Sequence, residues 1–109
     1  MVMADEVSAS LPERVRRGPS PIHGSGCFAV APIRSGAFIG TFTGPTVAED
    51  GEHVLWASLD GQSWQGRQGS SVLRYLNHSD RPNAAFDGFD LYAVTEIPAG
   101  AEITIDYQP

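Results

Sequence analysis

The sequence is short of the residues that build covalent or thiolate-centred sites. Its 109 residues include one cysteine, Cys27, so neither an internal disulfide nor a multi-cysteine metal site can form. No apolar stretch approaches the roughly 20 residues of a membrane-spanning helix. The amino terminus also lacks the hydrophobic centre of a secretion signal. We therefore expect a soluble intracellular protein without a membrane partner.

Lysine is absent altogether, and the charge is unevenly distributed. Seven arginines face 13 aspartates and glutamates, which gives a formal net charge of −6. Phosphate binding needs a basic face, so nucleic acid is not an expected direct partner. After Arg81 the sequence contains carboxylates but no lysine or arginine. This distribution would attract a basic peptide, although it would also serve solubility. These carboxylates are Asp87, Asp90, Glu96, Glu102 and Asp106.

Turn-forming residues are abundant, because 12 glycines and 8 prolines divide the chain into short apolar segments. This spacing predicts a mostly β fold of several small sheets, with a single domain over residues 13–109 after a flexible segment over 1–12. Asp60-Gly61 and residues 86–89 carry hairpin signals. Residues 70–76 are the only helical candidate, long enough for one or two turns. We expect strands over residues 27–33, 37–44, 53–60, 62–66, 83–94 and 101–107.

Two segments of the chain resemble each other. CFAVAPIRSGAFI at 27–39 and LYAVTEIPAGAEI at 91–103 share an aromatic-Ala-Val start, an isoleucine and a Gly-Ala pair. Each predicts a strand, a tight turn and a second strand. The repetition suggests two similar small sheets, although recurrent turn chemistry explains the match nearly as well. Between the repeats, Trp56 and Trp64 are expected to be buried in the core of this segment, with a contact to a second copy of the chain as the alternative.

Polar chemistry concentrates in RYLNHSDRPN, residues 74–83. A nucleophilic set of Ser79, His78 and Asp106 can be drawn, but the strained elbow around a catalytic serine is missing. The segment could instead be a buried polar loop, or it could pair with a flat heterocycle such as adenine. No metal site is predicted, because the histidines lack the short spacing of a ligand pair. These histidines are His23, His53 and His78.

Two further segments of the sequence, a Gly-rich segment and the segment at the carboxyl end, carry a recognisable local pattern. HGSGCF, residues 23–28, has glycines two apart, which lets the backbone approach a ligand closely but also suits a plain turn. EITIDYQP, residues 102–109, predicts a strand with Ile103, Ile105 and Tyr107 on one face and Thr104 and Asp106 on the other.

HGSGCFAVAPIRSGAFIGTFTG, RYLNHSDRPNAAF and LYAVTEIPAGAEITIDY resemble, in order and character, the three signature blocks of SET-domain protein lysine methyltransferases. The resemblance covers residues 17–107. It implies a β-clip type of fold whose carboxyl segment threads under the Asn-His-Ser loop in a pseudoknot. It implies S-adenosylmethionine as cofactor and the lysine amine of a basic protein, histone-like or other, as substrate. The alternative is a SET-fold module that binds cofactor or peptide without turnover.

The resemblance also implies roles for individual residues. Tyr107 would be catalytic, at the methyl-transfer centre, and Phe42, Phe86 and Ile105 would border the lysine channel. Phe42 stands where many relatives have a tyrosine, and the missing hydroxyl would favour higher methylation states. The implied cofactor-binding residues are Gly24, Ser25, Gly26, Arg74, Tyr75, Asn77, His78 and Tyr107.

The sequence continues only two residues beyond Tyr107 and lacks the cysteine-rich post-SET segment with which larger relatives bind zinc and close the channel. A second copy could close it, as in small viral relatives, so a homodimer is one expectation. The resemblance is consistent with a cytoplasmic protein in a prokaryote, and leaves association with chromatin or export to a host open.

Overall fold

The structure, a computed structural model, describes residues 14–106 of the chain. The expectations for residues 1–12 and for the placement of Tyr107 lie outside these described residues. Within them, short strands joined by turns confirm the mostly β fold of several small sheets. The elements are β2 (Val15–Pro19), β3 (Ser25–Ala29), β4 (Phe38–Thr41), β5 (Thr46–Val47), β6 (Val54–Ala57), β7 (Gln65–Gln68), the 3-10 helix η1 (Val72–Tyr75), β8 (Asn77–His78), β9 (Ala84–Asp87), β10 (Asp90–Ala93) and β11 (Glu102–Ile105).

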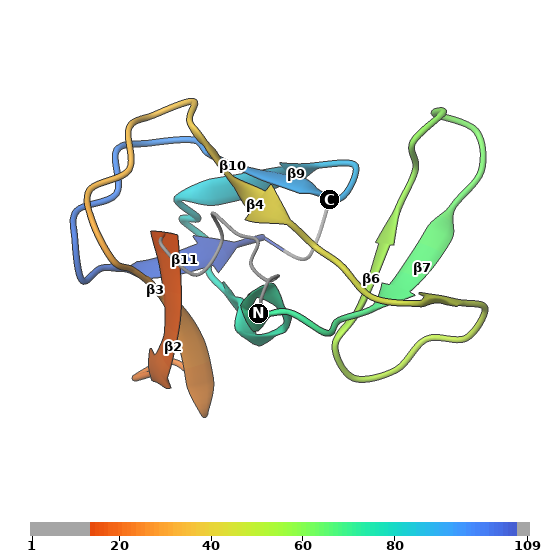
Figure 1. The fold of residues 1–109 in the computed structure, drawn as a ribbon, viewed down its shortest axis with the longest axis horizontal. Coiled ribbons are helices and arrows are strands. Elements are labelled where there is room, and N and C mark those ends of the chain that lie inside the picture. The colour runs from red at the N-terminus through yellow and green to blue at the C-terminus, as the bar shows by residue number, and fades with distance from the viewer. Residues whose placement is uncertain (1–13, 107–109) are drawn as a thin grey trace, which may run out of the picture.

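These strands form three sheets (Figure 1). One has the order β2-β3-β11-β8, the second β4-β10-β9 and the third β5-β7-β6. The third sheet lies between the two repeats in sequence, and its β6-β7 hairpin stands to one side of the other two sheets. The first two sheets therefore form a frame, and the third is an insert attached to it.

The two repeated segments pair with each other about an approximate two-fold axis. Ile33 and Ile97, which are equivalent in the two repeats, form a bridge with N···O distances of 2.8 Å in both directions. To one side of this bridge β3 pairs with β11, and to the other β4 pairs with β10, both antiparallel. The turn glycines Gly36 and Gly100 share a φ of 84°, which favours glycine. Each sheet of the frame thus takes one strand from each repeat.

The core of the frame is aliphatic, and each fully buried aliphatic side chain contributes about 1.5–3 kcal/mol. Leu73, on the single turn η1, is fully buried, and the Ser71 hydroxyl caps that turn by accepting a hydrogen bond from the Leu73 N–H at 3.3 Å. η1 is shorter than the predicted helical segment, since Leu76 already has extended backbone. The largest fully buried side chains are Cys27, Ile33, Ile39, Leu73, Leu91, Ile97 and Ile103.

β11 lies between two partner strands. It pairs antiparallel with β3 and parallel with β8, where Thr104 is opposite Asn77 and Ile105 is opposite His78. The Asn-His pair and the carboxyl-terminal strand are therefore neighbours in space, although they are distant in sequence. Thr104 is buried despite its polar side chain, with an exposed fraction of 7%.

The insert packs on the frame through Arg67 and exposes part of its aromatic surface. The Arg67 guanidinium lies 3.9 Å from the centre of the Phe89 ring and donates a hydrogen bond to the Phe42 carbonyl at 3.1 Å. Trp56 is half-buried against Gly66, whereas Trp64 is 69% exposed. The expected burial of Trp64 is therefore wrong, because this residue lies in the loop before β7, outside the strand pairing of the insert. Among residues 14–106, no helix is long and apolar enough to cross a membrane.

Candidate functional site

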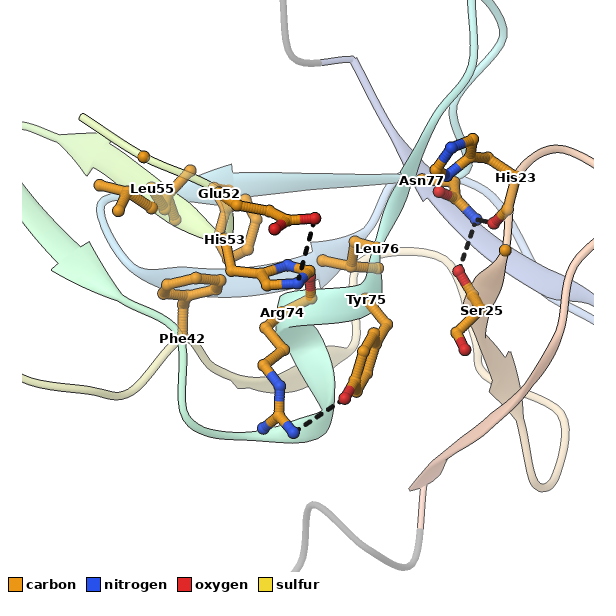
Figure 2. A pocket seen from close by; sticks show the side chains of 14 residues that line it. His23, Ser25, Phe42, Glu52, His53, Leu55, Arg74, Tyr75, Leu76 and Asn77 are labelled. Carbon is orange, nitrogen blue, oxygen red and sulfur yellow. Dashed lines mark hydrogen bonds and ion pairs between the residues drawn. The ribbon is translucent and has the colours of Figure 1, made fainter.

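A cavity of about 420 Å³ lies between the Gly-rich loop, η1 and the start of β6 (Figure 2). Its lining includes most of the residues that the resemblance assigns to cofactor binding, together with Phe42 and Phe86 of the expected lysine channel. We call it the first cavity. Its lining residues are His23, Gly24, Ser25, Phe42, Gly51, Glu52, His53, Val54, Leu55, Arg74, Tyr75, Leu76, Asn77 and Phe86.

Asn77 fastens the Gly-rich loop to β8. Its amide nitrogen donates to the carbonyl oxygens of His23 at 3.2 Å and Ser25 at 3.0 Å, and to the Glu102 carboxylate at 2.9 Å. Gly24, between the two carbonyls, has a φ of 46°, and a Cβ there would meet no atom within 4 Å. The loop backbone therefore borders open space, and the Asn77 side chain holds it there.

Glu102 supports the same loop through its carboxylate. The Ser20 hydroxyl lies 2.9 Å from both of its carboxylate oxygens and accepts a hydrogen bond from the Ile22 N–H at 3.0 Å. Gly26 is buried, and a Cβ at this position would collide with the Glu102 carboxylate. Gly26 is therefore needed for close approach of Glu102 and lies outside the cavity lining. The sequence analysis grouped Glu102 with the carboxylates that would attract a basic peptide and did not predict this supporting role; a carboxylate inside a strongly apolar strand was the available signal.

Tyr75 lies between two guanidinium groups. The guanidinium of Arg17 is 4.3 Å from its ring centre and that of Arg74 is 4.6 Å away, while Arg74 also donates to the Tyr75 hydroxyl at 2.8 Å. The Nε of Arg17 donates to the Ser25 hydroxyl at 3.0 Å. Within residues 14–106 the ion pairs involve histidines only, so neither guanidinium is neutralised by a carboxylate. This side of the cavity can receive an anionic group of a ligand.

His53 enters the cavity from the insert, and sequence reasoning had considered it only as a metal ligand. Its φ of 64° is unusual for a residue other than glycine. Its Nδ1 donates to the Arg74 carbonyl at 2.8 Å, and its ring meets the Tyr75 ring edge-on at 5.6 Å between centroids. Figure 2 shows the imidazole between Phe42 and Tyr75, beneath the Glu52 carboxylate.

A second cavity, also of about 420 Å³, shares Leu55 and Phe86 with the first. Phe86 packs edge-on against the buried Phe42, with 6.1 Å between ring centroids and 83° between ring planes. Ile105, the third expected channel residue, lines the second cavity only. The lining is mostly apolar and comprises Leu55, Trp56, Ala57, Ser58, Trp64, Pro82, Ala84, Ala85, Phe86, Gly88, Ile105 and Asp106.

His78 differs from the other predicted cofactor residues in its surroundings. Its imidazole is exposed and lies 3.1 Å from the Asp80 carboxylate and 3.5 Å from that of Asp106. It does not line the first cavity, and its backbone pairs with Ile105 of β11. No group of three histidine, cysteine, aspartate or glutamate side chains among the described residues is arranged to hold a metal ion.

The fold matches solved methyltransferase domains. The methyltransferase domain of human PR domain-containing protein 2 aligns with a TM-score of 0.66 and 21% identity, over 86% of this chain and 76% of that one. A putative histone methyltransferase of Plasmodium falciparum aligns with a TM-score of 0.69 and 21% identity, over 87% and 93%. At this identity the likeness shows a shared fold.

The sequence comparisons agree with the fold. Residues 24–108 match the model of the SET domain family, so the chain belongs to that family. Two Arabidopsis thaliana proteins are similar to it: histone-lysine N-methyltransferase ATX2, 27% identical, and histone H3-lysine(4) N-trimethyltransferase ATX1, 28% identical. Each alignment covers 88% of this chain but 11% of the relative, so the chain spans about a tenth of their length.

Proposed function

We propose that this protein is an S-adenosylmethionine-dependent protein lysine methyltransferase. The observation that carries the proposal is the pair of cavities that share Leu55 and Phe86. One cavity would hold the cofactor and the other the substrate peptide, with these two apolar side chains at the boundary where the methyl group is transferred. Membership of the SET domain family and the methyltransferase names of the relatives support the same assignment.

The first cavity has the chemistry that S-adenosylmethionine requires. Its volume of about 420 Å³ is within the usual range for small-molecule sites. The Arg74 guanidinium can pair with the ligand carboxylate, and the Glu52 carboxylate can attract its positive charges. The loop at Gly24 and the backbone near Asn77 offer polar groups for a flat base. The residues present therefore fit this cofactor.

The second cavity suits an extended peptide. It lies between residues of β6 and β9, which are both edge strands of their sheets. Edge strands leave backbone N–H and C=O groups without strand partners, and an added peptide strand can pair with them. The lining contains Asp106 and no arginine, which favours a basic segment. A lysine on such a peptide would reach the boundary at Phe86.

The residues at the boundary would prepare the lysine for reaction. Bound S-adenosylmethionine supplies a methyl group already activated by its sulfonium. Phe42, Phe86 and Ile105 are apolar, so they disfavour the charged ammonium form of the entering lysine and favour the nucleophilic amine. They also confine the side chain to one line of approach. Tyr107 is proposed to orient the amine through its hydroxyl.

A labelled methyl-transfer assay tests the proposal. The protein is incubated with methyl-labelled S-adenosylmethionine and a mixture of basic proteins, and the labelled residues are mapped. We expect label on lysines of the substrate proteins. We expect none on the enzyme itself, because its sequence contains no lysine. If calorimetry detects cofactor binding while no label is transferred, the protein is a binding module and the enzymatic proposal fails.

Tyr107→Phe tests the assigned catalytic residue. Loss of one positioned hydroxyl at a reaction centre should lower turnover roughly 100-fold. Cofactor affinity, measured by calorimetry, should change little because most of the lining stays intact. Single-turnover rates close to those of the unmodified protein would show that Tyr107 has no such role.

A further inference from the structure

We propose that His53 distinguishes the cofactor from the spent product by charge: a protonated imidazole would weaken binding of the sulfonium form more than that of the neutral thioether. This inference rests on the proposed function, in which the first cavity holds S-adenosylmethionine. His53 belongs to the insert, so the role would be a property of this chain's insert and not of its frame.

The hydrogen bond at Nδ1 determines what the other ring nitrogen offers. The Arg74 carbonyl can only accept, so Nδ1 carries the proton in the contact of 2.8 Å. In the neutral imidazole Nε2 is then an acceptor, and it lies 4.0 Å from the Glu52 carboxylate. The Gly69 N–H donates to the His53 carbonyl at 2.7 Å and fixes the backbone of this turn. The ring therefore has one orientation and one preferred tautomer.

The position of His53 places it near the reacting end of the ligand. In Figure 2 the imidazole lies beside Phe42, away from His23 and Asn77 at the other end of the view. Phe42 belongs to the expected methyl-transfer boundary, so the sulfonium is the ligand group expected near His53.

Few charged groups face the imidazole. From its own turn the neighbour is Glu52, which is negative, and from η1 the neighbours are Arg74, bonded through its carbonyl, and Tyr75, which presents its ring edge. Phe42 and the Gly69 backbone add no charge. A neutral His53 thus leaves the Glu52 carboxylate to attract a cation, whereas a protonated His53 adds a positive charge beside it.

The product of methyl transfer, S-adenosylhomocysteine, differs from the cofactor in the charge on sulfur but keeps its amino and carboxylate groups. The ratio of the two dissociation constants therefore isolates the interaction with the sulfonium. Histidine side chains take up a proton between about pH 8 and pH 5.5. At separations of several ångströms in a partly solvated site, one added charge should change the ratio about tenfold.

The experiment is calorimetric titration of both ligands at pH 8.0 and pH 5.5. In the unmodified protein we expect the Kd of S-adenosylmethionine divided by that of S-adenosylhomocysteine to rise about tenfold on acidification. His53→Asn should abolish this rise, because asparagine tolerates the same backbone and can still donate to the Arg74 carbonyl, but does not titrate. His23→Asn is the matched control at the other end of the cavity, and should retain the rise.

A ratio that does not change with pH in the unmodified protein overturns the inference, whatever the variants do. So does a rise that persists in His53→Asn or disappears in His23→Asn. Absence of S-adenosylmethionine binding at pH 8.0 would instead refute the proposed function on which the inference rests. Thermal melts at both pH values verify that each variant is folded.

Discussion

Two asparagines that both form hydrogen bonds with residues of β11 offer a matched test of the cofactor loop. The Asn77 amide nitrogen carries two hydrogens that are shared among the carbonyls of His23 and Ser25 and the Glu102 carboxylate. Asn77→Ala removes the equivalent of two hydrogen bonds, each with a net value of about 0.5–1.5 kcal/mol. If one to two kcal/mol of this holds the loop in its binding position, cofactor affinity should fall roughly 5- to 30-fold.

Asn83→Ala is the control, because Asn83 also joins β11 through its amide but lies outside both cavities. It donates to the Glu102 carbonyl and accepts from the Thr104 N–H, each at 2.8 Å. Its removal leaves a buried N–H of β11 without its partner, at a cost of about 1–3 kcal/mol. Asn83→Ala should therefore destabilise the fold at least as much as Asn77→Ala, while changing cofactor affinity less than about twofold.

Calorimetry with S-adenosylmethionine and denaturant unfolding of the two variants measure both quantities. Asn77→Ala should lose more cofactor affinity than Asn83→Ala. Asn83→Ala should lower the free energy of unfolding at least as much as Asn77→Ala does. Equal losses of affinity in the two variants would refute the reasoning, since they would show that general loosening of the sheet, and not the loop contacts, lowers the affinity.

Two further predictions concern buried side chains of the frame. Burial raises the pKa of Cys27 to about 12, so the folded thiol stays protonated while the thiol of the unfolded chain ionises above about pH 9. Between these pH values the free energy of unfolding should fall with rising pH by up to about 1.4 kcal/mol per pH unit relative to that of Cys27→Ala. Equal pH dependences of the two proteins in denaturant unfolding would contradict this. Phe42→Tyr adds a hydroxyl beside Phe86, and mass spectrometry of a methylated peptide should show a shift toward lower methylation states; an unmodified enzyme that stops at monomethyl-lysine would contradict the expectation.

The frame was largely predictable, because its signals are local. Alternating apolar residues and turn glycines such as Gly36 and Gly100 indicate strands and turns wherever the partner lies. The similarity of residues 27–39 and 91–103 also predicted two similar sheets. It could not predict that each strand of one repeat pairs with a strand of the other repeat. Such pairing depends on which strand edges remain unpaired once the other strands are in place. β2 and the two-residue strands β5 and β8 were missed for the same reason.

The site was less predictable than the frame. The ordered blocks led to Ser25, Arg74, Tyr75 and Asn77 at one cavity, but nothing in the sequence placed His53 beside them. His53 reaches the site because a turn with positive φ carries the insert back over η1, a path determined by tertiary contacts. Trp64 was misjudged because composition predicts burial on average and cannot tell that this residue lies in the loop before β7, outside the strand pairing of the insert.

The strand exchange between the repeats bears on how the chain is made on the ribosome. β3 and β4 are synthesised before the insert, whereas their partners β11 and β10 are synthesised after it. Until the second repeat leaves the exit tunnel, the nascent chain has two strands with open edges and an apolar surface that only the second repeat can cover. The frame can therefore form only after the second repeat has emerged, and a chain stalled or truncated before that point would be a natural client for chaperones and proteases.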